Sequence, residues 1–326
     1  MLKKLVSIDG ISGYEAPVRN CILQEIKPYI NNVNIDTMGN MVATQKNNPN
    51  AKNVLLVAHM DESGFIITKI TDDGYLKFEI IGSVDLKTLL SKKVIVNGLN
   101  GVIALKAIHL TTKAERENPI KSDELFIDIG ANNKKEAEKY VDVGDYFTFN
   151  SDYVEFGNNF IKSKALASRT GCAILIDILK LELNANITCV FSVQNNINNR
   201  GADVVFNNLL ADYAIIIDSV ECSDTTVEFE NTTALNYGPI FSINKVNMTL
   251  INKLFEIAKK NNIKYQMAFN KNNLSKINKI QTANNGIQTA KINLPCRYIN
   301  SDANVINKND YYRAEDIIIK FLEEVK

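Results

Sequence analysis

Side chains that could bind a metal or transfer a proton follow two apolar runs of the sequence. The run VLLVA (residues 54–58) leads into His59, Asp61 and Glu62, and the run YAIII leads into Asp218. Imidazole and carboxylate groups are common ligands of catalytic zinc, and they also act as general acids and bases. In open α/β sheets, sites gather beyond the carboxyl ends of the strands. These residues are therefore candidates for one catalytic or metal-binding site.

Two further apolar runs end in amides where acids are usual. ITCVFSV (residues 187–193) is followed by Gln194, Asn195 and Asn196, and TAKINLP is followed by a segment that contains Asn300. A carboxamide can neither hold a proton for transfer nor neutralise a dication. The sequence therefore raises the question of whether these segments belong to a working catalytic site.

The segments that would position these residues alternate between helix and strand. Five stretches show apolar residues at helical spacing, and four short apolar runs are typical of buried strands. The expected helices cover residues 16–30, 170–183, 201–210, 248–263 and 313–326, and the expected strands cover residues 54–60, 187–193, 213–218 and 289–294. Such alternation predicts an α/β fold with a mainly parallel sheet flanked by helices.

A β-rich segment interrupts this alternation. Two hairpins are expected in it, the first with Asp73-Gly74 at its turn, and two further strands follow with a short helix between them. We therefore predict a small all-β domain at residues 65–162, inserted into an α/β domain that comprises residues 1–64 and 163–326.

Composition excludes several classes of protein. The 326 residues are 45% hydrophobic, and the 37 basic residues equal the 37 acidic ones, so no global field attracts nucleic acid or an anionic membrane. The apolar runs are too short to span a bilayer. Five scattered cysteines favour reduced structural thiols in a cytoplasmic protein. The two histidines are His59 and His109, and a structural role is the default for the second.

Nine motifs in order give the sequence a family resemblance. They are LVSIDGISGYEAPVR, IDTMGN, AHMDESGF, IGSVDLKTLL, KALASRTG, NRGA, IIIDS, YGPIF and PCRYINS. The chain resembles the tetrahedral (TET) aminopeptidases of metallopeptidase family 42, variously labelled glutamyl aminopeptidases or endoglucanases. The resemblance implies a dinuclear zinc or cobalt centre in an α/β domain and a β-rich dimerisation insert. It also implies a particle, commonly of twelve subunits, that trims peptides from their N-termini.

Three residues of the family's site are expected to be retained. The resemblance places the first metal histidine at His59, the carboxylate that orients it at Asp61, and a further metal-binding aspartate at Asp218. By the family pattern, His59 and Asp218 would bind different ions of the metal pair.

Four other positions of the family's site are degenerate. The metal-bridging aspartate falls on Ala167, the general-base glutamate on Asn195, a metal-binding glutamate on Asn196, and the last metal histidine on Asn300. Each metal would thus keep one protein ligand, whereas catalytic zinc normally has about three plus water. Loss of the general base alone commonly lowers a rate by ~10²–10⁴.

We therefore predict a catalytically inactive member of the aminopeptidase family, with no cofactor and a role in binding or assembly. Its expected partners are further copies of the same chain, in a dimer or a dodecamer, or an active paralogue. Peptides are a further expected ligand, whereas nucleic acids and membranes are not.

Two other functions stay open. A working glutamyl-type aminopeptidase would need new ligands that converge on one metal, for which Asp61, Asp218, Asp224 and Glu62 are the candidates. If the family activity is retained, the expected cofactor is two zinc or cobalt ions. A glycosidase would need paired carboxylates across a cleft. Arg169 and Arg200 are either neutralising partners of Asp218 or solvated residues.

Overall fold

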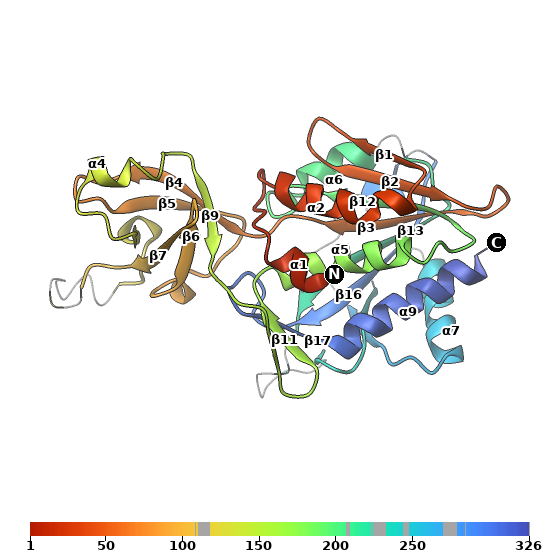
Figure 1. Ribbon diagram of the computed structural model, residues 1–326. Helices are drawn as coiled ribbons and strands as arrows, with labels where there is room; N and C mark the ends of the chain where they lie inside the picture. Colours follow the sequence, from red (N-terminus) through yellow and green to blue (C-terminus); the bar gives the residue numbers. More distant parts are fainter. Residues whose placement is uncertain are drawn as a thin grey trace.

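An α/β unit lies beside a small β-barrel in the computed structural model of the chain (Figure 1). The structure describes residues 1–107, 109, 118–206, 209–222, 224, 233–243, 248–269, 279–283 and 285–325. Both ends of the chain lie in the α/β unit. None of the helices within these ranges is both long enough and apolar enough to cross a membrane.

The α/β unit is built on a mixed sheet, which has eight strands within the described ranges. In spatial order these are β1 (Asn32–Ile35), β2 (Met41–Lys46), β12 (Asn186–Ser192), β3 (Asn53–His59), β13 (Tyr213–Glu221), β16 (Gln288–Cys296), β14 (Ile240–Ile243) and β15 (Gln266–Phe269). The four central strands, β12, β3, β13 and β16, run parallel, whereas β1, β2 and β14 pair with their inner neighbours in antiparallel fashion. The expected parallel pairing therefore holds at the centre of the sheet and for the edge pair β14 and β15, whereas β1, β2 and the β14–β16 pair depart from it.

Helices cover both faces of this sheet. On one face pack α1 (Leu2–Val6), α2 (Ala16–Ile26), α5 (Leu166–Leu179), α7 (Thr249–Lys260) and α9 (Lys308–Glu324), and on the other packs α6 (Arg200–Val205). Successive strand residues point to opposite faces. Thus Leu56 and Ala58 join the first cluster, whereas Leu55 and Val57 join the second.

Several predicted helix boundaries differ from the structure. The first long helix, α2, ends at Ile26 and continues only as a 3₁₀ turn, η1 (Lys27–Tyr29), because Pro28 cannot donate a backbone hydrogen bond. Helix α5 begins at Leu166, four residues earlier than predicted. Strands β1, β2, β14 and β15 were not predicted from the sequence.

The barrel is closed in the described part of the chain and is antiparallel throughout. Its strands follow the order β4 (Gly64–Ile70), β5 (Leu76–Ile81), β8 (Phe126–Asp128), β7 (Leu99–Ala104), β6 (Lys93–Val96) and β9 (Tyr146–Phe149). The predicted hairpin around Gly74 is confirmed, because β4 pairs with β5. A separate apolar core fills the barrel, where Phe65 stacks on Phe147 at 4.9 Å between ring centroids. The short elements η2 (Leu86–Thr88), η4 (Ser122–Glu124) and α4 (Lys134–Ala137) connect the strands.

The barrel strands account for residues 64–149 of the predicted insert, which extends to residue 162. The remaining strands of that segment, β10 (Val154–Phe156) and β11 (Phe160–Ser163), pair instead with β17 (Asn304–Asn307) near the C-terminus. This small sheet ties the chain that leaves the barrel to the α/β unit.

Candidate functional site

A pocket of about 180 Å³ lies at the carboxyl ends of the central parallel strands. Its walls come from β3 and β13, the segment after β12, the first turn of α5 and the segment after β16. All seven site residues predicted from the sequence line it, namely His59, Asp61, Ala167, Asn195, Asn196, Asp218 and Asn300. The structure therefore gathers positions that lie up to 241 residues apart in the sequence.

The parallel register of the strands brings the two ionisable ligand types together. Ile216 of β13 pairs with Val57 of β3, so His59 and Asp218 lie level with each other, two residues further along each strand. On the other side of β3, Ser192 of β12 is the pairing partner of His59. The side chains of His59 and Asp218 are 7% and 14% exposed, so both groups interact mainly with the protein.

The imidazole of His59 lies between two carboxylates. Its Nδ1 atom is 3.2 Å from Oδ1 of Asp61, and its Nε2 atom is 3.5 Å from Oδ1 of Asp218. The two side chains therefore meet at one point of the pocket, with the His59 ring in contact with both carboxylates.

Asp61 is fully buried and accepts several hydrogen bonds. The Ser12 hydroxyl donates to its Oδ2 atom at 2.6 Å, and the backbone N–H and side-chain amide of Asn196 donate to the same atom at 2.8 and 2.9 Å. Burial alone would raise the pKa of Asp61, but His59 and these donors outweigh it and hold the pKa well below its usual range. Asp61 is therefore a permanent carboxylate that orients His59.

Lys291 is a charged neighbour of the pocket that sequence reasoning missed. Its Nζ atom is 2.9 Å from Oδ2 of Asp218, and its side chain is only 6% exposed. The available signal was a lysine inside the otherwise buried strand TAKINL. An ammonium group thus lies beside the carboxylate that the family resemblance assigns to a metal.

The other degenerate positions offer neutral groups. Ala167 presents a methyl group and Asn300 accepts a weak hydrogen bond from the Ser63 hydroxyl at 3.3 Å. The Oδ1 atom of Asn195 is buried, and no hydrogen-bond partner for it exists among the described residues. None of these three side chains can act as a proton acceptor at neutral pH.

The loops around the pocket adopt strained backbone conformations. Ala165, Gln194, Tyr298 and Asn300 all have positive φ angles, at 57°, 52°, 57° and 62°. Such conformations cost roughly 1–3 kcal/mol each for most non-glycine residues and persist where the surrounding structure imposes them. Glu15 helps to impose the second, because its carboxylate accepts a hydrogen bond from the backbone N–H of Gln194 at 2.8 Å.

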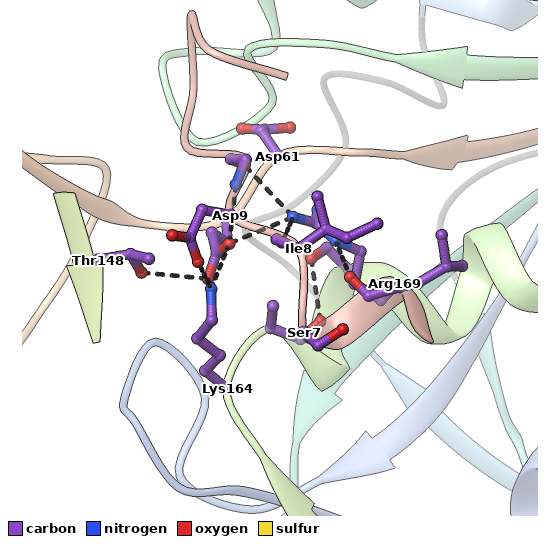
Figure 2. A network of polar contacts seen from close by, with 12 residues as sticks. Ser7, Ile8, Asp9, Asp61, Thr148, Lys164 and Arg169 are labelled. Carbon is purple, nitrogen blue, oxygen red and sulfur yellow. Dashed lines mark hydrogen bonds and ion pairs between the residues drawn. The ribbon is translucent and has the colours of Figure 1, made fainter. Parts of the chain in front are cut away.

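A network of ion pairs, largely buried, adjoins the pocket through Glu62, which lines it (Figure 2). Lys164 is 2.7 Å from Asp9 and 3.0 Å from Glu62, and Arg169 is 3.2 Å from the same Glu62 carboxylate. Thr148, from barrel strand β9, donates to Glu62 at 3.3 Å. Arg169 is therefore not the partner of Asp218 that the sequence suggested, and Glu62 is committed to a structural contact between barrel and α/β unit.

The other proposed neutralising residue and the other candidate ligands also lie apart from the pocket's ionisable pair. Arg200 is exposed at the start of α6, and His109 is exposed as well. Asp224 binds Arg297 through both carboxylate oxygens, each contact being 2.8 Å long. Burial would raise the pKa of Asp224, but the Arg297 guanidinium more than offsets this and lowers it. Within the described ranges, no group of three or more His, Cys, Asp or Glu side chains is arranged to hold a metal.

Comparison with known proteins identifies the family. The M42 glutamyl aminopeptidase family matches residues 39–317. A protein of Acetivibrio thermocellus, named provisionally as an aminopeptidase, is 32% identical over 98% of this chain and 97% of its own length. The chain therefore belongs to the M42 glutamyl aminopeptidase family, a family of metallopeptidases.

Solved structures of similar proteins support the same conclusion. The aminopeptidase APDkam598 of Desulfurococcus kamchatkensis is 31% identical, with a TM-score of 0.92 over all of this chain and 94% of that one. The TET1 peptidase of Pyrococcus horikoshii is 29% identical, with a TM-score of 0.85 over 99% of this chain and 98% of its own, and it can assemble into a tetrahedron or a large octahedral shell.

The side chains of this pocket do not fit the pair of metal ions that the family implies. One imidazole and one carboxylate, those of His59 and Asp218, could contribute to an ion, and both already contact charged or polar groups of the chain. The amides of Asn195, Asn196 and Asn300 bring no negative charge, which zinc and cobalt sites need. No reaction step through a metal is therefore derived for this chain.

Proposed function

We propose that this protein is a catalytically inactive member of the M42 aminopeptidase family that acts by binding or assembly. The observation that carries the proposal is the pocket itself, in which all seven expected positions meet and four of them hold Ala or Asn. Because the fold brings these positions together, the residues found there are the ones that would have to bind the metals. Ala167, Asn195, Asn196 and Asn300 offer neither a carboxylate nor an imidazole.

The chemistry of peptide hydrolysis explains why these losses would be decisive. A bound metal lowers the pKa of its water and polarises the scissile carbonyl, and a general base then takes the proton of that water. Asn195 cannot accept that proton, and Ala167 cannot bridge two ions. Because the missing groups act in the same step, their loss removes the route and does not merely slow it.

The proposed role rests on what the fold retains. Strained loops at Ala165, Gln194 and Tyr298 surround the pocket, and strain of this kind is typical of functional sites, although Ala167, Asn195 and Asn196 bring no acid to it. The pocket is lined largely by hydroxyl and amide groups, which would suit the polar backbone of a peptide.

Assembly is the second part of the proposed role. The barrel would serve as the dimerisation domain inserted at residues 65–162 of the α/β domain. The protein would form a homo-oligomer, either a dimer or a dodecamer, or would join an active paralogue in a mixed particle. The assembly of the Pyrococcus horikoshii relative supports this part of the proposal. Five free buried thiols support a reducing compartment such as the cytoplasm.

An active aminopeptidase is the second candidate, and family membership over residues 39–317 favours it. It would require ligands for zinc or cobalt that differ from the family pattern. Glu62 and Asp224 are engaged by Lys164, Arg169 and Arg297, which leaves this candidate with the weaker support.

Metal analysis combined with an activity assay tests the proposal. The protein is purified without chelator, its zinc and cobalt content is measured, and hydrolysis of aminoacyl-p-nitroanilides is assayed with each ion added. We expect no turnover above the rate of a matched preparation of the His59→Ala variant. Turnover that requires His59, together with two bound ions per chain, would contradict inactivity and support the active enzyme.

A further inference from the structure

We propose that the ammonium group of Lys291 is the resident cation of this pocket and that it keeps divalent metal from His59 and Asp218. The inference rests on the proposed function and gives it a physical cause. It goes further in one respect. It attributes the absence of metal binding partly to the positive charge of Lys291, and not only to the missing carboxylate and imidazole ligands.

The sheet explains how a lysine reaches this point. Lys291 of β16 pairs with Ile216 of β13, and Asp218 lies two residues further along β13 on the same face of the sheet. The neighbours of Lys291 in the strand, Ala290 and Ile292, pack into the apolar cluster on the opposite face. The lysine stem therefore runs beside Ile216, and only the ammonium arrives at the end of the pocket.

Burial makes this contact obligatory for both partners. Lys291 is 5% exposed, and an ammonium removed from water requires a compensating negative group. Asp218 in turn lies across His59 from the fully buried carboxylate of Asp61. Two carboxylates on one imidazole repel each other, and the ammonium of Lys291, 2.9 Å from Oδ2 of Asp218, offsets part of that repulsion.

The same position excludes a second cation. A zinc ion bound by His59 Nε2 and Asp218 would lie within a few ångströms of the ammonium, in a site with little water to screen the repulsion. One Asp218 oxygen is moreover already in contact with Lys291. Metal binding would therefore require the ammonium group to move away from Asp218.

Replacement of the lysine tests this directly. In the Lys291→Met variant, which keeps the length of the stem and removes the charge, we expect zinc to bind at least tenfold more tightly than to the native chain. Titration calorimetry with zinc alone and the visible absorption spectrum with cobalt alone provide the measurements. The Lys291→Arg variant, which keeps the charge, should bind zinc no better than the native protein.

Two further variants show where the zinc binds and whether Lys291 and Asp218 neutralise each other's charge. Adding His59→Ala to Lys291→Met should abolish the gain in affinity. The double variant Lys291→Met/Asp218→Asn should melt closer to the native temperature than either single variant does, because it leaves no unpaired buried charge. This comparison of melting temperatures remains informative even if one single variant folds poorly.

The outcomes separate this inference from the proposed function. The role of Lys291 would be overturned if the native chain and the Lys291→Met variant bound zinc with affinities within threefold of each other. It would also be overturned if the losses of melting temperature in the two single variants, Lys291→Met and Asp218→Asn, simply added up in the double variant. Turnover by the native protein would instead refute inactivity. Tighter zinc binding by the variant, without turnover by either protein, would support both proposals.

Discussion

At the scale of single residues, Asn196 makes a contact that a carboxylate could not make. Its side-chain amide donates to Asp61 at 2.9 Å, in a place where Asp61 is fully buried. A glutamate or aspartate at this position would bring a second negative charge to the same oxygen unless a metal lay between them. Asn196 is therefore part of the hydrogen bonding that holds the buried Asp61 carboxylate.

The Asn196→Asp variant tests this contact. It replaces a donor by an acceptor next to Asp61, so we expect it to lower the free energy of unfolding at pH 7 by about 1–3 kcal/mol. The loss should shrink as the pH falls, because protonation of the new carboxyl restores a donor. Urea denaturation measures the change, and Asn158→Asp on the exposed surface is the matched control. Equal stabilities of the two variants would contradict the role given to Asn196.

Some residues of the site could be predicted from the sequence and others could not. The seven pocket positions were predicted through the family resemblance. All of them except Ala167 also follow an apolar run, and strand ends in such a fold converge. Lys291 could not be predicted, because a lysine in a strand usually reaches solvent, and only the pairing of β16 with β13 directs it toward Asp218. The partners of Arg169 were missed for the same reason, since Glu62 meets it through tertiary structure.

At the scale of secondary-structure elements, the ion network of Glu62, Lys164 and Arg169 joins the barrel to the α/β unit. It connects β9, the segment after β3, the residue pair before α5, and α5 itself (Figure 2). All three charged side chains are nearly inaccessible to solvent. A network of this kind fixes the orientation of the elements it connects, because none of its members can be solvated separately.

Removal of Lys164 should loosen this junction. In the Lys164→Met variant we expect a loss of roughly 3 kcal/mol in the free energy of unfolding, because Asp9 and Glu62 lose a buried partner. Hydrogen exchange of β9 amides should become faster than that of the barrel's far strands. The Lys52→Met variant removes an exposed ion pair with Asp212 and should cost less than about 1 kcal/mol. An equal loss in both variants would contradict a special role of the network.

The elements themselves were predictable in proportion to their length and burial. The central strands β3, β12, β13 and β16 are long apolar runs, and their existence followed from the sequence. The four-residue strands β1, β14 and β15 did not, because a run of four residues is too short to establish a period, and these strands owe their structure to the neighbouring strand. Helix α5 began earlier than predicted because Leu166 packs in a core cluster that only the folded chain reveals.

At the scale of the whole molecule, an inactive site would leave assembly as the property on which selection could act. The barrel exposes Leu90, Val102, Tyr140 and Val143, each by 42% or more, although it has a complete apolar core of its own. Apolar side chains of this kind suit an interface with a second chain. These four residues are therefore candidates for the proposed dimer interface.

Light scattering coupled to size exclusion would measure the assembly. We expect a mass that is a multiple of the 36.5 kDa chain. The Val143→Lys variant should reduce the mass or raise the concentration needed for assembly, since it places a charge on the barrel surface. Leu181→Lys, at an exposed position just after α5, is the matched control. A native protein that remains a single chain at all concentrations would refute self-assembly.

The chain of contacts from Asp61 through His59 and Asp218 to Lys291 has a consequence for the life of the protein in a cell. A pocket whose charges are balanced by covalently attached groups needs no delivery of an ion during or after synthesis. Such a protein would reach its final shape under zinc starvation as readily as in plenty, and a strong chelator would leave its melting curve unchanged. A mixed particle would then contain one kind of subunit that depends on trace-element supply and another that is indifferent to it.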